Sequence, residues 1–369
     1  MKSIEYPVNI KQCEELTADA LASGLVPFLH SSPGCGKSSI IKSIARKFNL
    51  KLIDLRLSTI DSVDLSGMPM IDNETKQVDW KPFDVFPLKN AKLPVEKRKD
   101  GSEHTYAGWL LFLDEFNSAS EAVIAAAYNV VLDHRIGIYD LHPNCFIACA
   151  GNREEDRAIT TNIGSAMTSR LVHLNLEPTV DEWIDNVAIP QHYDFRIPAF
   201  LSMNPKAFMT FDPKLPTDTY CCPRTWEFVN RELKCFLESD PKLKKLKTKL
   251  PLLAGTINKG EAVEFVQFCE VVADLPTFQS IVNNPKTTPI PDDQATLWAV
   301  VSMCLNKVTV KTIDAVGQYI KRIGDRGMQT LFVRGALRLN RSLITAKIVT
   351  DFVADLSLEI AELNDELAA

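Results

Sequence analysis

The sequence lacks the features that mark membrane-spanning, secreted and zinc-binding proteins. No apolar run approaches the roughly 20 residues that a membrane-spanning helix needs, and the first residues lack the apolar core of a signal peptide. The nine cysteines are scattered, without a CxxC pair or a Cys/His cluster at zinc-ligand spacing. We therefore expect a cytoplasmic protein that does not associate with membranes and whose cysteines are buried free thiols.

Tandem repeats, low-complexity tracts and an excess of positive charge are also missing. The net charge of -6 argues against a protein that mainly binds nucleic acid, and we interpret the lysine-dense segment 242–249 as a solvated face. With 369 residues, of which 46% are hydrophobic and 24% charged, the chain has the composition of a globular protein of two or three domains.

What the sequence does contain is a phosphate-binding loop. Residues 31–38, Ser-Ser-Pro-Gly-Cys-Gly-Lys-Ser, depart from the pattern GxxxxGK[ST] only where Ser31 replaces the first glycine. The apolar run 25–29 precedes the loop and a helical apolar pattern follows it, which predicts a strand, a loop and a helix. Backbone N–H groups of such a loop cradle phosphates, Lys37 reaches the β- and γ-phosphates, and the Ser38 hydroxyl binds Mg²⁺. The predicted phosphate-loop residues are Ser32, Pro33, Gly34, Cys35, Gly36, Lys37, Ser38 and Ser39.

Two carboxylates follow the clearest predicted strand, residues 109–113. Four consecutive apolar residues run into Asp114 and Glu115, which is typical of a strand that is buried on both faces and opens into a ligand crevice at its carboxyl end. We expect Asp114 to bind Mg²⁺ together with Ser38, and Glu115 to activate the attacking water.

A polar residue also follows the apolar strand predicted over residues 145–150. Asn152 comes directly after Gly151, where its amide can orient a water near the γ-phosphate. The alternative is that Asn152 only forms the turn that the neighbouring glycine favours.

Two further strands are predicted at 50–57 and 171–176, and a hairpin at 134–142. Ser118 and Glu121 have the spacing of a capping box, which predicts a helix from about residue 122 to 132. After Pro178 the pattern becomes mainly helical, with helices at 180–188, 223–237 and 260–273 and from 294 onward, and a loop over 189–222.

Taken together, these motifs resemble the AAA+ ATPase superfamily, and within it the MoxR-like branch of the AAA-5, dynein-related group. The resemblance covers about residues 25–235. In order along the chain, the matching segments are Ser31 to Ser38 (Walker A), Leu110 to Glu115 (Walker B), Gly151 to Arg153 (sensor 1), Arg170 (arginine finger) and Pro223-Arg224 (sensor 2).

The resemblance implies an α/β fold. A P-loop core with a central parallel five-stranded sheet would occupy residues 1–177, with a helix-2 insert at about 58–108. An α-helical lid with sensor 2 would follow at 178–288, and C-terminal helices at 289–369. ATP would lie between core and lid, where Arg224 contacts phosphate of its own subunit and Arg170 reaches the site of a neighbour. Arg153 and Arg157 compete with Arg170 for the finger role.

The resemblance further implies a Mg²⁺-dependent ATP hydrolase that assembles into a homo-oligomeric ring, a hexamer, and remodels or assembles a protein client. The insert and the hairpin near Gly137 would face the pore or one ring surface, and a von Willebrand factor A-domain protein would be a partner. Two alternatives remain. One is a DNA-directed AAA+ motor or loader, and the other is a nucleotide-bound scaffold without activity, in which Ser31 marks degeneration.

Overall fold

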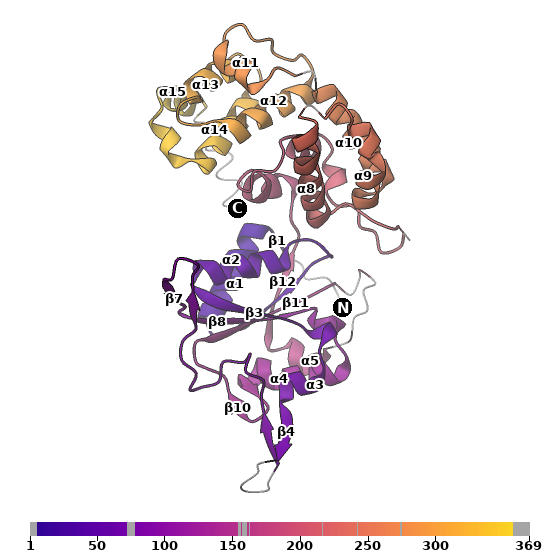
Figure 1. The fold of residues 1–369 in the computed structure, drawn as a ribbon, viewed down its shortest axis with the longest axis vertical. Helices are drawn as coiled ribbons and strands as arrows, with labels where there is room; N and C mark the ends of the chain where they lie inside the picture. The colour runs from indigo at the N-terminus through magenta and orange to yellow at the C-terminus, as the bar shows by residue number, and fades with distance from the viewer. Residues whose placement is uncertain are drawn as a thin grey trace. The chain divides into compact units, whose positions relative to one another are not determined.

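The computed structural model describes residues 6–71, 78–153, 156, 161, 163–215, 217–241, 243–273 and 275–356. The chain divides into two compact units, Met1–Pro178 with Asp212–Leu215, and Thr179–Phe211 with Pro216–Ala369. The first unit contains the strands of the main sheet, and the described part of the second unit is helical (Figure 1). The division between lid and C-terminal region near residue 288 stays a prediction.

A parallel sheet of six strands forms the centre of the first unit, and every neighbouring pair in it is parallel. The predicted fold class, α/β with a parallel central sheet followed by C-terminal helices, is confirmed. The sheet adds one strand, β1, to the five that were predicted, because two residues carry no periodic pattern. In spatial order the strands are β1 (Pro7–Val8), β12 (Leu171–Leu176), β2 (Val26–His30), β11 (Cys145–Gly151), β8 (Gly108–Asp114) and β3 (Leu50–Arg56).

Helices cover both faces of this sheet, as Figure 1 shows. On one face lie α1 (Ile10–Ala22) and α2 (Lys37–Lys47), and on the other lie α3 (Ser62–Ser66), α4 (Glu121–Asp133) and α5 (Gly164–Thr168). Side chains of β8 therefore alternate between two apolar layers, and all those from 110 to 113 are fully buried.

In the part of the first unit that the structure describes, three antiparallel hairpins extend from the main sheet and its helices. Two lie in the predicted insert, β4 (Met68–Ile71) with β5 (Val78–Lys81) and β6 (Val95–Lys97) with β7 (Glu103–Thr105). The third, β9 (Arg135–Ile136) with β10 (Tyr139–Asp140), confirms the hairpin predicted at 134–142.

The second unit is built from helices around an aromatic core. Trp226 of this unit is fully buried and packs against Phe200 and Phe265. The helices are α6 (Val180–Trp183) with a π-helical continuation (Ile184–Ala188), α7 (Arg196–Met203), α8 (Pro223–Ser239), α9 (Leu250–Ile257), α10 (Lys259–Val272), α11 (Phe278–Asn283), α12 (Gln294–Lys307), α13 (Ile313–Lys321), α14 (Arg326–Leu339) and α15 (Lys347–Asp355).

Two local predictions were wrong. The stretch 189–222 is not only loop, since α7 lies within it. Its Pro198 is tolerated because proline falls in the first helical turn, where backbone N–H groups have no intrahelical partner. The helix after β8 is capped by Ser120, whose hydroxyl accepts from the N–H of Val123, and not by Ser118, which lies in a 3₁₀ turn.

The cysteines behave as expected with one exception. None of the nine, all of which the structure describes, forms a disulfide, and Cys235 is the one that is exposed. Within the described ranges, no helix is both long and apolar enough to cross a bilayer.

Candidate functional site

The predicted phosphate loop, the two carboxylates and Asn152 gather at one edge of the sheet. β2, β11 and β8 are consecutive parallel strands, so their carboxyl ends lie side by side. The phosphate loop follows β2, Asp114 ends β8 and Glu115 follows it, and Asn152 follows β11. Three segments separated by tens of residues thus contribute to one place, as expected for a ligand crevice in a parallel α/β sheet.

Two glycines give the phosphate loop its shape. Gly34 and Gly36 have φ angles of +82° and +98°, which residues other than glycine rarely adopt. Gly36 is the N-cap of α2 and offers no side chain to the first helical N–H groups. A helix N-terminus without a side-chain cap can bind an anionic ligand through its backbone N–H groups.

The side chain of Lys37 connects the loop to β11. Its Nζ donates to the Ser31 carbonyl at 3.0 Å, to the Ser31 hydroxyl at 3.0 Å and to the Asn152 side-chain oxygen at 3.2 Å. The Ser31 hydroxyl donates in turn to the Ser32 carbonyl at 2.9 Å. The residue that departs from the glycine pattern is therefore fully buried and hydrogen-bonded to the loop lysine.

The two predicted Mg²⁺ ligands are in direct contact. The Ser38 hydroxyl donates to one oxygen of Asp114 at 3.0 Å, and the other oxygen accepts from the backbone N–H of Glu115 at 2.8 Å. Hydroxyl and carboxylate oxygens are the ligands that Mg²⁺ prefers, and it keeps several waters beside one or two such groups. The donor set therefore fits this ion beside a phosphate.

Glu115 has a left-handed backbone, with φ +54°. Such a conformation is uncommon for a residue with a side chain and is found at active sites more often than elsewhere. Its carboxylate accepts a hydrogen bond from the hydroxyl of Ser58, which follows β3. Ser58 was not predicted as a site residue, because no local pattern links it to a strand end more than fifty residues away.

Asn117 was also missed. Its side-chain amide donates to the Asn152 carbonyl at 2.7 Å, and its oxygen accepts from the Asn152 N–H at 3.1 Å. Both backbone groups of Asn152 are thereby fixed. Gly151 allows this approach, since a Cβ there would lie 2.3 Å from the Asn117 oxygen.

The predicted arginines have different surroundings. Arg170 is exposed, donates to the Ala166 carbonyl at 2.8 Å and forms no ion pair with any residue that the structure describes. Arg153 is held within its own subunit by Glu177 at 2.8 Å and by the Leu176 carbonyl at 3.1 Å. Arg157 lies outside the described residues, and Arg224 is exposed on α8 in the second unit.

A pair of histidines lies at the base of the phosphate loop, His30 as the last residue of β2 and His173 on the neighbouring strand β12. His30 Nε2 and His173 Nδ1 are 2.8 Å apart, and His173 Nε2 lies 2.9 Å from the Thr168 carbonyl. Burial first, and then the neighbouring His173, Lys37 and Arg153 in that order, together lower the pKa of His30 to about 3. The His30 imidazole is therefore neutral at physiological pH.

One acidic side chain also contacts the loop. The Ser32 hydroxyl donates to Asp156 at 3.2 Å, and burial raises the pKa of the Asp156 carboxyl. Asp54 lies on β3, the strand next to β8, and burial and the neighbouring Asp114 raise the pKa of its carboxyl.

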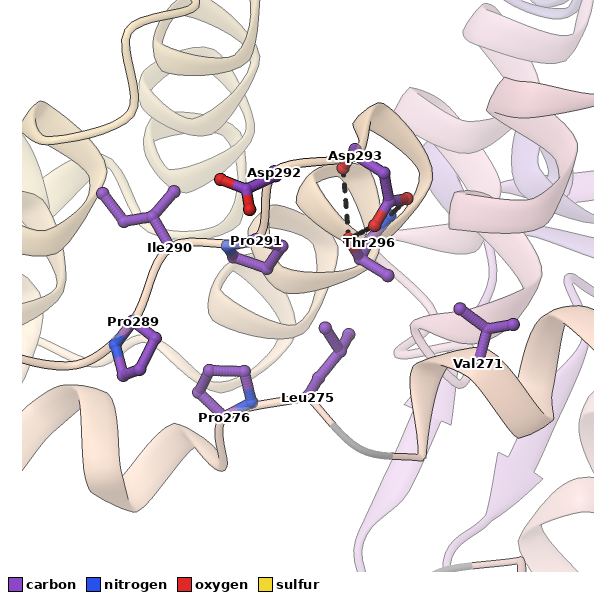
Figure 2. A pocket seen from close by; sticks show the side chains of 9 residues that line it. All are labelled: Val271, Leu275, Pro276, Pro289, Ile290, Pro291, Asp292, Asp293 and Thr296. Carbon is purple, nitrogen blue, oxygen red and sulfur yellow. Dashed lines mark hydrogen bonds between the residues drawn. The ribbon is translucent and has the colours of Figure 1, made fainter.

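The second unit contains a cavity of about 400 Å³ with a different character (Figure 2). Its wall is mostly proline and aliphatic and includes Leu275, Pro276 and Ile290, and the carboxylate of Asp292 belongs to the same lining. Asp293 is engaged as the N-cap of α12, where it hydrogen-bonds Thr296. The Thr296 hydroxyl also bonds the Asp293 carboxylate as part of this cap, and no described residue of the lining is a lysine, arginine or histidine that could bind a phosphate. We therefore place the candidate site in the first unit.

Comparison with known proteins adds fold neighbours. No protein-family model matches the chain. A candidate ATPase from Cytophaga hutchinsonii is similar in structure at 12% identity, covering 94% of this chain and 81% of that one, with a TM-score of 0.34. Two single-residue variants of RuvB from Thermotoga maritima are similar as well. One is 15% identical over 94% of this chain and 87% of its own, with a TM-score of 0.33. The other is 17% identical over 84% and 87%, with a TM-score of 0.37.

Proposed function

We propose that the chain is a Mg²⁺-dependent AAA+ ATPase that hydrolyses ATP to ADP and phosphate. The observation that carries the proposal is the convergence of three strand ends on one site, with Ser38 bonded to Asp114 and Lys37 bonded to Asn152. A loop lysine, a hydroxyl–carboxylate pair and a carboxylate base together match the requirements of phosphoryl transfer to water.

Each side chain then has a defined role. Bound Mg²⁺ would neutralise phosphate charge, held by Ser38 and Asp114. Lys37 exchanges its bonds to Ser31 for phosphate oxygens, and the N–H groups at the start of α2 bind the same anion. Glu115 takes a proton from the attacking water, which Asn152 orients. Ser58 holds the Glu115 carboxylate before the water is in place.

The proposal extends to a ring of like subunits, a hexamer of the MoxR-like branch. Arg170 supports it, because an exposed guanidinium without an acidic partner among the described residues is available to a neighbouring site. Arg224 would contact phosphate from the lid of the same subunit. The ring would remodel or assemble a protein client, with a von Willebrand factor A-domain protein as partner.

Replacement of Glu115 by Gln tests the base. The Glu115→Gln variant should bind ATP as the wild type does but hydrolyse it at least about a hundredfold more slowly, since an amide cannot accept the proton. Lys37→Ala should lose ATP binding itself. Phosphate release near the wild-type rate in Glu115→Gln would overturn the assignment, and equal rates in wild type and Lys37→Ala would favour a scaffold without activity.

A DNA titration separates the proposal from a DNA-directed motor. Such a motor would bind DNA with an affinity that falls steeply with salt, and DNA would stimulate its ATPase. We expect neither, because the net charge is -6. The measurement is filter binding at two salt concentrations, with ATP turnover followed in parallel.

A further inference from the structure

The hydrogen bonds of the two histidines run in one direction. The Thr168 carbonyl can only accept, so a neutral His173 carries its one hydrogen on Nε2 and presents a bare Nδ1. His30 Nε2 must then donate to that Nδ1 across 2.8 Å. The result is a fixed chain from His30 through His173 to the Thr168 carbonyl.

One end of this chain meets the phosphate loop. His30 is the last residue of β2 and directly precedes Ser31. The carbonyl and the hydroxyl of Ser31 accept hydrogen bonds from the ammonium of Lys37. Phe28 packs against both imidazoles, with ring centroids 4.2 Å and 5.7 Å away, so the rings have little freedom to turn. The position of the His173 ring is therefore tied to the base of the loop.

The other end of the chain meets the segment that carries Arg170. Thr168 ends α5, where the last carbonyls of a helix need partners from outside the helix. The guanidinium and the backbone N–H of Arg170 bind the Ala166 and Met167 carbonyls, and His173 binds the Thr168 carbonyl. The turn that carries Arg170 is thus held by a hydrogen bond from the His173 imidazole as well as by hydrogen bonds to its own helix.

We propose that His30 and His173 are positioning residues that set the place of Arg170 relative to the phosphate loop of the same subunit. This inference rests on the proposed function, in which Arg170 serves the site of a neighbouring subunit. The pair would then fix the position of Arg170, which serves the next subunit, relative to the nucleotide site of its own subunit. An apolar pair of similar volume would fill the same space without this connection.

Glutamine and asparagine at position 173 carry the same amide group on side chains of different length. A glutamine can accept from His30 and donate to Thr168, whereas the shorter asparagine cannot span both partners. A third variant, His173→Phe, keeps a ring and removes both hydrogen bonds. Steady-state kinetics and ATP affinity are measured for all three, in the wild-type background and together with Arg170→Ala.

The expected result is a loss of about tenfold in kcat for His173→Asn and His173→Phe, with KM and ATP affinity within about twofold of wild type. His173→Gln should keep most of the kcat, and the losses should vanish in the Arg170→Ala background because there is no finger left to position. The inference is overturned if the Gln and Asn variants behave alike, or if the loss persists without Arg170. Failure of the proposed function itself would appear separately, as a wild-type protein that turns over no faster than Glu115→Gln.

Discussion

At the scale of single residues, the imidazole of His30 couples folding to pH. A histidine in the unfolded chain titrates near pH 6.5, whereas burial and the neighbouring His173, Lys37 and Arg153 lower the pKa of His30 in the folded chain to about 3. Between these two values the unfolded chain binds more protons than the folded chain. The stability therefore falls as the pH falls through this window.

The first prediction follows from this difference. His30 should contribute a slope of up to about 1.4 kcal/mol of stability per pH unit below pH 6.5, and His30→Gln should remove that contribution. Hydrogen exchange in peptides of β8 and β11 at pH 6.5, 5.5 and 4.5 measures the free energy of opening of the first unit. The same slope in both proteins would contradict the assignment, whatever their difference at neutral pH.

A second residue-scale prediction concerns Gly151. A methyl group there would meet the Asn117 oxygen at 2.3 Å and Phe28 at 3.0 Å, so Gly151→Ala should destabilise the first unit by about 1–3 kcal/mol. It should also slow ATP turnover, because Asn117 would release the backbone of Asn152. Gly255 in α9 has open space around it, and Gly255→Ala is the matched control that should leave turnover unchanged. Hydrogen exchange and phosphate release report the two effects.

At the scale of elements, the sequence predicted those strands and loops that a local residue pattern specifies. The phosphate loop follows from one contiguous motif, and β8 and β11 follow from apolar runs that only a doubly buried strand requires. The contacts that complete the site could not be found this way. Asn117 binds Asn152 and His30 binds His173 across 35 and 143 residues, and only the folded sheet brings them together.

The start of α4 gives the third prediction. Ser120→Ala should weaken the first turn of α4 by about 1 kcal/mol, since the Ser120 hydroxyl accepts from the N–H of Val123. Ser118→Ala is the control and should change the same quantity by less than about 0.5 kcal/mol. The measurement is hydrogen exchange at the first amides of α4. A larger effect at Ser118 would restore the capping box that the sequence pattern suggested.

At the scale of the whole molecule, the proposed ATPase depends on assembly. The fourth prediction is that Arg170→Ala lowers the rate of hydrolysis by about 10³-fold or more while ATP still binds, because the missing charge belongs to a neighbouring site. The turnover per subunit of the wild type should also fall on dilution below the concentration at which subunits associate. Turnover that is independent of concentration would show that one subunit suffices.

Arg153 is the matched control for this experiment. Its guanidinium is already bound to Glu177 and the Leu176 carbonyl, so Arg153→Ala should disturb its own subunit. Its activity should therefore not recover when it is mixed with Glu115→Gln subunits, which supply an intact Arg170. Arg170→Ala should recover activity in the same mixture.

The hydroxyl of Ser31 has a consequence for how nucleotide is captured. Incoming phosphate must compete with oxygens of the chain itself for the ammonium of Lys37, and the serine side chain adds one competitor that a glycine would not have. As the fifth prediction, Ser31→Gly should bind ATP about threefold to tenfold more tightly, the equivalent of one charge-assisted hydrogen bond shared with solvent. Calorimetric titration measures this, and weaker binding by the glycine variant would refute it. Serine in place of the usual glycine would then lower the affinity for ATP, and the subunit would stay empty until ATP is abundant.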